Sequence, residues 1–151
     1  MTIIYRLTLT ISDASMIPAL QQENFFLSKT LHLTSTIGQD LEADHIQLKN
    51  AFGYDHSFVL NGTENQLTLE EPVSGRRLII STTAPVVQVY TGNFLKDGCI
   101  GKAGRVYENR EGVALETQLM PNAINTEENP STILRKGDKF ESNTKYVFEI
   151  M

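Results

Sequence analysis

The sequence predicts an all-β protein built as a β-sandwich or barrel. Apolar residues recur with a period of two, Gly, Pro and Asn interrupt the apolar segments at short intervals, and no strong helical pattern is present. A period of two is typical of strands that bury one face. Because the chain has no internal repeat and no low-complexity linker, we expect residues 1–151 to form a single domain.

The first expected strand covers residues 7–11, where leucine and isoleucine alternate with threonine. Residues 39–48 carry only a partial apolar stripe, so we expect at most a short turn of helix there. This weak helical signal does not change the predicted fold class.

Two hairpins are expected next. The dipeptide at 61–62, Asn-Gly, readily adopts the positive φ angles of a tight turn and would join strands at residues 57–60 and 66–69. Residues 71–75 contain Pro and Gly and would connect the second of these strands to a third at residues 77–80.

The C-terminal part of the chain continues the strand pattern. Residues 113–122 form a strand-like apolar stretch, and the last strand places Tyr146, Phe148 and Ile150 on one face. Residues 121–130 are polar and irregular, which is consistent with a long connection near a binding site.

Composition argues against several classes of partner. The 13 Lys and Arg residues against 18 Asp and Glu residues give a formal charge of −5, without a basic cluster, which argues against nucleic acid and a membrane surface as partners. No apolar stretch approaches the roughly 20 residues of a membrane-spanning helix, and no secretory signal is apparent.

The single Cys99 cannot form an internal disulfide, so we expect a cytoplasmic protein. One Cys and three scattered His residues lack the ligand spacing of a structural zinc site.

Asp55 and His56 are the first candidates for chemistry. Adjacent residues of an extended segment point to opposite faces, so these two cannot easily act as a pair. Asp55 either accepts hydrogen bonds from a ligand hydroxyl or stabilises the turn before the strand. His56 either contacts a ligand or is a structural histidine with its hydrogen bonds satisfied. His32 and His45 lie in polar sequence and are expected at the surface.

Gln88 is the second candidate, because it shares a strand face with Val86 and Tyr90 and would project among apolar and aromatic groups. A buried amide needs hydrogen-bond partners. These are either hydroxyls of a ligand or groups on a neighbouring strand. Tyr90 either supplies a flat apolar platform for the ligand or belongs to the core.

Glu116 is the third candidate, since it stands in the middle of an apolar, strand-like stretch. Burial would raise the pKa of its carboxyl group and make it a candidate general acid or base. The alternative is an ion pair with an arginine, for which the sequence offers Arg76, Arg77 and Arg105.

Four segments together carry a resemblance to a known family. They are 53–56 (Gly-Tyr-Asp-His) followed by Phe58, 88–93 (Gln-Val-Tyr-Thr-Gly-Asn), 115–118 (Leu-Glu-Thr-Gln) and 133–137 (Ile-Leu-Arg-Lys-Gly). In order and spacing they resemble the motifs of the aldose 1-epimerase family, the galactose mutarotases. The resemblance runs from about residue 7 to the end of the chain and is specific after Gly53.

The resemblance implies a galactose mutarotase-like supersandwich and an isomerase that interconverts the α and β anomers of hexoses such as galactose or glucose. By the same resemblance, Glu116 is the catalytic general base that takes the proton from the anomeric hydroxyl, and Asp55 and Gln88 bind other hydroxyls of the substrate. No cofactor and no metal are implied.

One part of the family pattern is absent. The family's general acid is a histidine in a His-aromatic-Phe-Asn-Leu motif that precedes the region resembled by residues 7–11, and this motif does not occur in the chain. We therefore expect a truncated sandwich, the C-terminal half of the family's domain, with little activity of its own. The alternative is a non-catalytic carbohydrate-binding or interaction fragment. Open sheet edges are expected to support a homo-oligomer.

Overall fold

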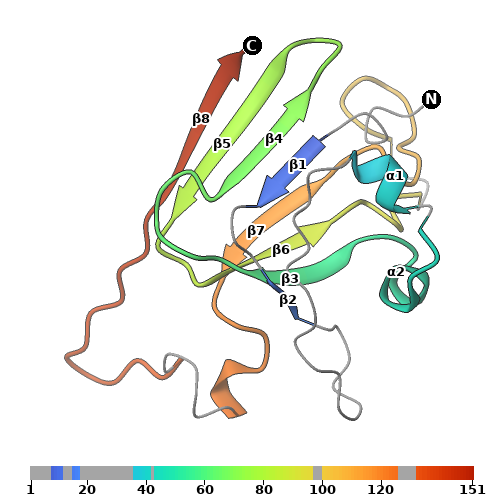
Figure 1. Cartoon of the computed structure of the whole chain (residues 1–151). Coiled ribbons are helices and arrows are strands. Elements are labelled where there is room, and N and C mark those ends of the chain that lie inside the picture. The colour runs from blue at the N-terminus through green and yellow to red at the C-terminus, as the bar shows by residue number, and fades with distance from the viewer. Residues whose placement is uncertain (1–7, 12–14, 18–35, 42, 97–99, 126–131) are drawn as a thin grey trace.

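Two antiparallel sheets make up the fold, as the all-β prediction requires (Figure 1). The computed structural model describes residues 8–11, 15–17, 36–41, 43–96, 100–125 and 132–151. One sheet has the strand order β1-β4-β5-β8 and the other β2-β3-β6-β7. The strands are β1 (Thr8–Ile11), β2 (Ser15–Ile17), β3 (Asp55–Val59), β4 (Leu67–Glu71), β5 (Arg76–Thr82), β6 (Val86–Tyr90), β7 (Ala114–Gln118) and β8 (Thr144–Ile150).

Two short helices, α1 (Ile37–Leu41) and α2 (Ile46–Ala51), replace the single helical turn expected over residues 39–48. The partial apolar stripe of that segment belongs to both helices, because Leu41 packs against the core from α1 and Leu48 from α2. A 3-10 helix, η2 (Ala123–Asn125), follows β7. Among the described residues no helix has the length and apolar character needed to cross a membrane.

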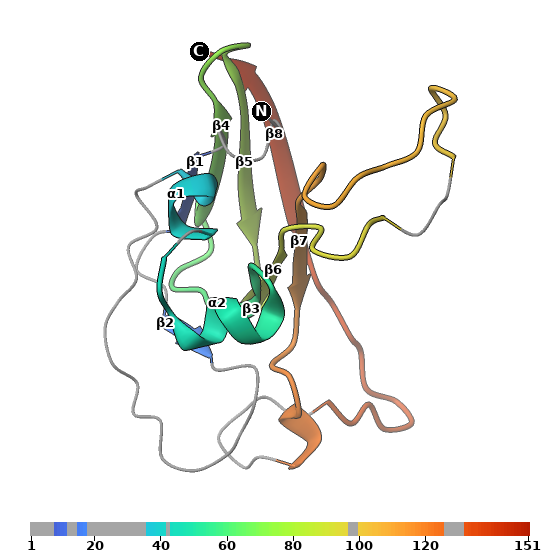
Figure 2. The same cartoon turned by 90° about the vertical axis from the view of Figure 1, so that its right-hand side faces the viewer.

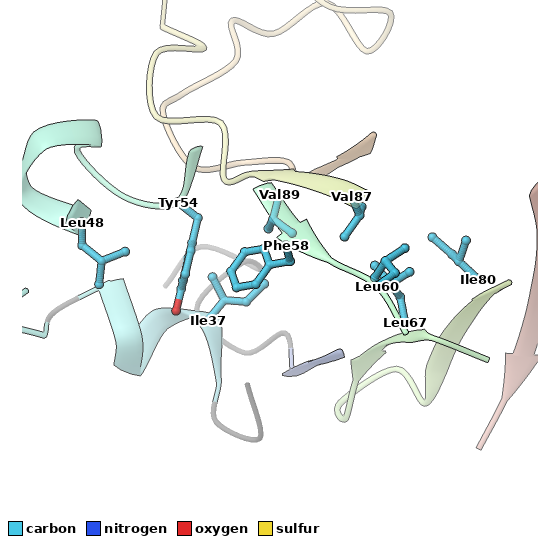
Figure 3. Packing of buried hydrophobic residues seen from close by; sticks show 9 residues of the cluster. All are labelled: Ile37, Leu48, Tyr54, Phe58, Leu60, Leu67, Ile80, Val87 and Val89. Carbon is cyan, nitrogen blue, oxygen red and sulfur yellow. The ribbon is translucent and has the colours of Figure 1, made fainter. Parts of the chain in front are cut away.

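The core lies between the two sheets and is closed at one end by the helices (Figure 3). Phe58 and Val87 contribute from one sheet, and Leu67 and Ile80 from the other, all with no exposed surface. Ile37 of α1 packs into the same cluster. Phe58, Val87, Leu67 and Ile80 thus mark the core faces of β3, β6, β4 and β5.

The turn at Asn61-Gly62 does not form the predicted hairpin. Gly62 has the expected positive φ of 71°, but β3 pairs with β2 and β6, whereas β4 pairs with β1 and β5. The buried Gln66 side chain explains the change of sheet, because its amide donates to the carbonyls of Gly62 and Thr82 at 2.8 and 3.1 Å and its oxygen accepts from the Thr82 N–H at 2.7 Å. The segment is therefore held against β5 and not against β3.

The second predicted hairpin is confirmed, since β4 and β5 pair antiparallel and Glu71 lies opposite Arg76. The Glu71 carboxylate accepts hydrogen bonds from the N–H groups of Val73 and Ser74 at 3.2 and 2.7 Å. A buried carboxylate is thereby satisfied within the turn that it closes.

Candidate functional site

The outer face of the sheet β2-β3-β6-β7 brings the predicted site residues together. The register places Ser57 opposite Gln88 and Gln88 opposite Glu116, so the three lie in one row across β3, β6 and β7. Asp55 precedes Ser57 by two residues and therefore shares its face of β3. Phe58 and the other core residues of these strands occupy the opposite face.

Gln88 forms hydrogen bonds to two side chains of β3, Ser57 in the same row and Asp55 beside it. Its Nε2 donates to Oδ1 of Asp55 at 2.7 Å, and its Oε1 accepts from the hydroxyl of Ser57. The amide is half-buried on the face that it shares with Val86 and Tyr90. Its partners are groups on the neighbouring strand β3, which is one of the two alternatives that the sequence left open. The cross-strand bonds orient the amide and leave its second N–H without a partner among the described residues.

Asp55 and His56 point to opposite faces, as predicted: Asp55 is exposed and His56 is 1% exposed. Nδ1 of His56 accepts a hydrogen bond from the Asp55 N–H at 3.0 Å, while Nε2 bonds to none of the residues that the structure describes. Burial lowers the pKa of His56, and the nearby Asp55 carboxylate opposes this shift. His56 thus lies on the core face and does not belong to the row, and with one ring nitrogen unpartnered among the described residues it is not the histidine with satisfied hydrogen bonds that the sequence offered as one alternative.

Glu116 is exposed, so the prediction of a buried carboxylate is wrong. Its neighbour Leu115 packs against the core, which directs Glu116 to the outer face of β7. Arg77 pairs with Glu70 and Glu149, and Arg105 pairs with Glu111. No ion pair joins Glu116 to any described residue, and its carboxylate faces solvent beside Gln88.

Tyr90 lies opposite Asp55 in the register and is half-buried on the same outer face. Its phenolic oxygen accepts a hydrogen bond from the Phe94 N–H at 3.0 Å, which holds the ring beside the row. Tyr90 is therefore not a core residue, and an aromatic side chain borders the site.

Thr91 and Asn93 form a clamp that the sequence analysis did not identify as functional. Thr91 Oγ1 accepts from the Tyr54 N–H at 3.0 Å, and Asn93 Nδ2 donates to the carbonyls of Ala51 and Tyr54 at 2.8 and 2.9 Å. The hydroxyl of Thr91 donates to Asn93 Oδ1 at 2.7 Å. The clamp fixes the backbone at the start of β3 and so positions Asp55. Both residues lie within the 88–93 segment that the resemblance had singled out.

The remaining histidines do not join the row. His32 lies outside the described residues. His45 is half-buried at the start of α2, where its Nδ1 accepts from the Gln47 N–H at 3.3 Å, so it is a helix cap and not a free surface group. In the described part of the chain, no group of three or more His, Cys, Asp or Glu side chains is placed to hold a metal ion.

Comparison with known proteins decides the family. The family model described as Aldose 1-epimerase matches residues 5–147. The chain belongs to the aldose 1-epimerase family. Galactose mutarotase from Sus scrofa is 35% identical over 146 residues, which cover 91% of this chain and 40% of that protein. Aldose 1-epimerase from Escherichia coli strain K12 is 34% identical over 118 residues, covering 74% of this chain and 34% of that protein.

Solved structures of this family share the fold. The GalM/aldose epimerase homologue from C. elegans superposes with a TM-score of 0.78 at 22% identity, over 97% of this chain and 46% of that chain. Galactose 1-epimerase from Lactobacillus acidophilus NCFM gives a TM-score of 0.64 at 21% identity, over 97% and 44%. The chain therefore spans less than half the length of the relatives that it matches.

Proposed function

We propose that this chain carries the general base and the hydroxyl-binding groups of an aldose 1-epimerase site for a hexose such as galactose or glucose. The observation that carries the proposal is the shared face of Asp55, Gln88 and Glu116, with Gln88 and Glu116 directly opposite in the register. Opposed residues of neighbouring strands have Cβ atoms about 4.5–5.5 Å apart, within reach of one sugar ring.

The polar side chains on this face of the sheet suit a polyhydroxyl ligand. The Asp55 carboxylate accepts hydrogen bonds, and the second N–H of Gln88 is available to donate one. A sugar hydroxyl does both, so it can bridge the two side chains. Tyr90 adds an aromatic side chain at the border of the site, against which the apolar face of a sugar ring can pack.

In this proposal Glu116 takes the proton from the anomeric hydroxyl while the bond between the anomeric carbon and the ring oxygen breaks. A general acid gives a proton to the ring oxygen; rotation of the carbonyl carbon and closure on its other face then give the second anomer. A positioned proton-transfer group contributes about 10²–10⁴-fold to the rate. His56 lies on the opposite face and His45 caps α2, so we expect slow mutarotation from the chain alone.

Polarimetry of freshly dissolved α-galactose and α-glucose tests this role of Glu116. We expect the chain to accelerate the change in rotation and Glu116→Gln to abolish the acceleration. Glu64→Gln is the matched control, because Glu64 is an exposed carboxylate in the loop between β3 and β4. Equal catalysed rates for the chain and Glu116→Gln would overturn the proposal.

A non-catalytic carbohydrate-binding function is the second candidate. It is favoured by the exposure of Glu116 and by the absence of a histidine from the outer-face row in the part of the chain that the structure describes. Saturation-transfer NMR with galactose and glucose separates the two. Binding that Asp55→Asn weakens, without any acceleration of mutarotation, would support this function, whereas no binding would contradict both.

A further inference from the structure

The peptide group between Tyr54 and Asp55 is hydrogen-bonded at both of its polar ends. Its carbonyl, on Tyr54, accepts from the Thr91 N–H at 3.1 Å and from Nδ2 of Asn93 at 2.9 Å. Its N–H, on Asp55, donates to Nδ1 of His56 at 3.0 Å. Because a peptide group is planar, bonds at both ends determine the orientation of the whole plane. The backbone from which the Asp55 side chain projects is therefore fixed.

The bond to His56 takes the place of a bond to a neighbouring strand. The Tyr54 carbonyl faces β6, and hydrogen-bonding direction alternates along an antiparallel strand, so the Asp55 N–H points away from β6. On that side β3 pairs with β2, whose described residues end at Ile17, opposite Ser57. Within the described structure β2 does not reach Asp55, and the imidazole of His56 accepts from the N–H instead.

The core holds the ring of His56 in place. The side chain is 1% exposed, and its ring meets that of Tyr54 edge to face, with 6.1 Å between centroids and 88° between planes. Helix α2 lies beside this end of β3 in both views (Figures 1 and 2), and Leu48 of α2 belongs to the same core cluster as Tyr54. The imidazole that accepts from Asp55 therefore has little freedom to rotate.

The acceptor at Nδ1 defines the protonation state of the ring. A ring nitrogen that accepts a hydrogen bond carries no proton, so the neutral ring holds its proton on Nε2. An imidazolium has donors at both nitrogens and could not accept from Asp55. Burial lowers the pKa of His56, the Asp55 carboxylate opposes this shift, and the nearby His45 of α2 adds to it. The lowered pKa favours the neutral ring that the bond requires.

The fixed backbone brings the carboxylate of Asp55 to Gln88. Oδ1 of Asp55 accepts from Nε2 of Gln88 at 2.7 Å on the outer face of the sheet. His56 is the next residue along β3 and lies on the core face. His56 can therefore affect the outer face through the backbone of Asp55.

We infer that His56 is a positioning residue, which holds the Asp55 backbone through Nδ1 of its neutral ring so that the Asp55 carboxylate meets Gln88 and a sugar hydroxyl. The contact with a sugar rests on the proposed function. The contact with Gln88 does not, because it exists without a ligand. Loss of the acceptor at Nδ1 should disturb Asp55 and Gln88 in the free protein as well as in the sugar complex.

Nitrogen-15 NMR of the full chain, labelled in its histidines, tests the state of the ring. We expect His56 to show an unprotonated Nδ1 and a protonated Nε2 at neutral pH. His56→Asn identifies the signals, since they disappear in that variant. A proton on Nδ1 would overturn the inference, because the ring could not then accept from Asp55.

Two substitutions separate the acceptor from the rest of the side chain. His56→Asn places an oxygen on Cγ, where Nδ1 is attached, whereas the amide of His56→Gln lies one carbon further out and offers no acceptor at that position. In the sugar-free protein we expect faster hydrogen exchange of the Asp55 amide and shifted side-chain amide resonances of Gln88 in His56→Gln. Both should stay close to their original values in His56→Asn. Ile80→Val, which trims a fully buried side chain of the other sheet, controls for a loss of stability alone.

Titration with galactose, followed by saturation-transfer NMR, measures the effect on binding. We expect the Kd to rise about two- to ten-fold in His56→Gln, as for the loss of one hydrogen bond, and to change little in His56→Asn and Ile80→Val. If none of the proteins binds sugar but the Asp55 and Gln88 signals change only in His56→Gln, the proposed function fails and the positioning by His56 is supported. Equal signals in His56→Gln and His56→Asn, or an equal loss of affinity in Ile80→Val, would overturn the inference.

Discussion

Gln88 of β6 donates a hydrogen bond from its Nε2 to Oδ1 of Asp55 on β3, across 2.7 Å. The two residues are 33 positions apart in the chain and become neighbours only because β3 and β6 pair antiparallel. The hydroxyl of Ser57 completes the arrangement by donating to Oε1 of Gln88. The amide of Gln88 is therefore oriented before any ligand binds.

Ser57→Ala tests whether this orientation matters for binding. The variant loses a hydrogen bond worth about 0.5–1.5 kcal/mol, so we expect galactose affinity in saturation-transfer NMR to fall about two- to ten-fold. Ser57→Thr keeps the hydroxyl and should retain most of the affinity. The side-chain amide resonances of Gln88 give an independent measurement, because they should shift in Ser57→Ala without any sugar. Unchanged amide resonances would show that Ser57 does not orient Gln88.

Gly53→Ala should destabilise the fold at the start of β3. Gly53 has φ of +142°, and a Cβ atom there would collide with the side chain of Asn93 and lie 2.9 Å from Thr91 Oγ1. We expect a loss of at least about 1–3 kcal/mol from backbone strain alone, measured by urea denaturation. Gly62→Ala is the control, since Gly62 also has a positive φ but no atom lies within 4 Å of the added Cβ. An equal loss in both variants would show that the clamp can move aside.

Phe58→Ala should cost about 3–5 kcal/mol of unfolding free energy, because Phe58 is fully buried at the centre of the core. Phe140→Ala removes the same ring from a site that is 65% exposed and should change stability by less than about 0.5 kcal/mol. Chemical denaturation of both variants compares the two losses. Similar losses would contradict the placement of the core between the sheets.

Stability should decrease as the pH falls below about 6.5, the ordinary pKa of histidine. Burial lowers the pKa of His56 in the folded chain, so between the folded and unfolded pKa values the unfolded chain binds the additional proton. His56→Asn, which retains an acceptor for the Asp55 N–H but does not titrate, should show a smaller change in melting temperature between pH 7 and pH 5. An identical pH dependence in both proteins would exclude His56 as the cause.

Much of the fold could be predicted because it depends on local alternation. The strands at β4, β5 and β8, the turn between β4 and β5, and the opposite directions of Asp55 and His56 all follow from a period of two. The prediction of a hairpin at Asn61-Gly62 was wrong, because the turn dipeptide determines only the local φ angles and not which strands pair. The Gln66 bonds to Gly62 and to Thr82 of β5 determine which sheet the chain enters.

The candidate site, like the fold, could be predicted only in part from the sequence. Asp55, Gln88 and Glu116 could be named from their motifs, and the family could be recognised from the order of those motifs. Ser57 carried no signal, because its function depends on a partner on another strand. Glu116 was expected to be buried because its sequence neighbours are apolar, but alternation places it on the face opposite to Leu115.

The sequence by itself determined the all-β class, the family resemblance and the side chains available for chemistry, since each of these depends on residue type and local spacing. Only the tertiary structure decided the shared face of Asp55, Gln88 and Glu116 and the clamp of Thr91 and Asn93. These features depend on strand register and on which face of each sheet is covered. Both are set by contacts between residues far apart in the chain, which no local pattern encodes.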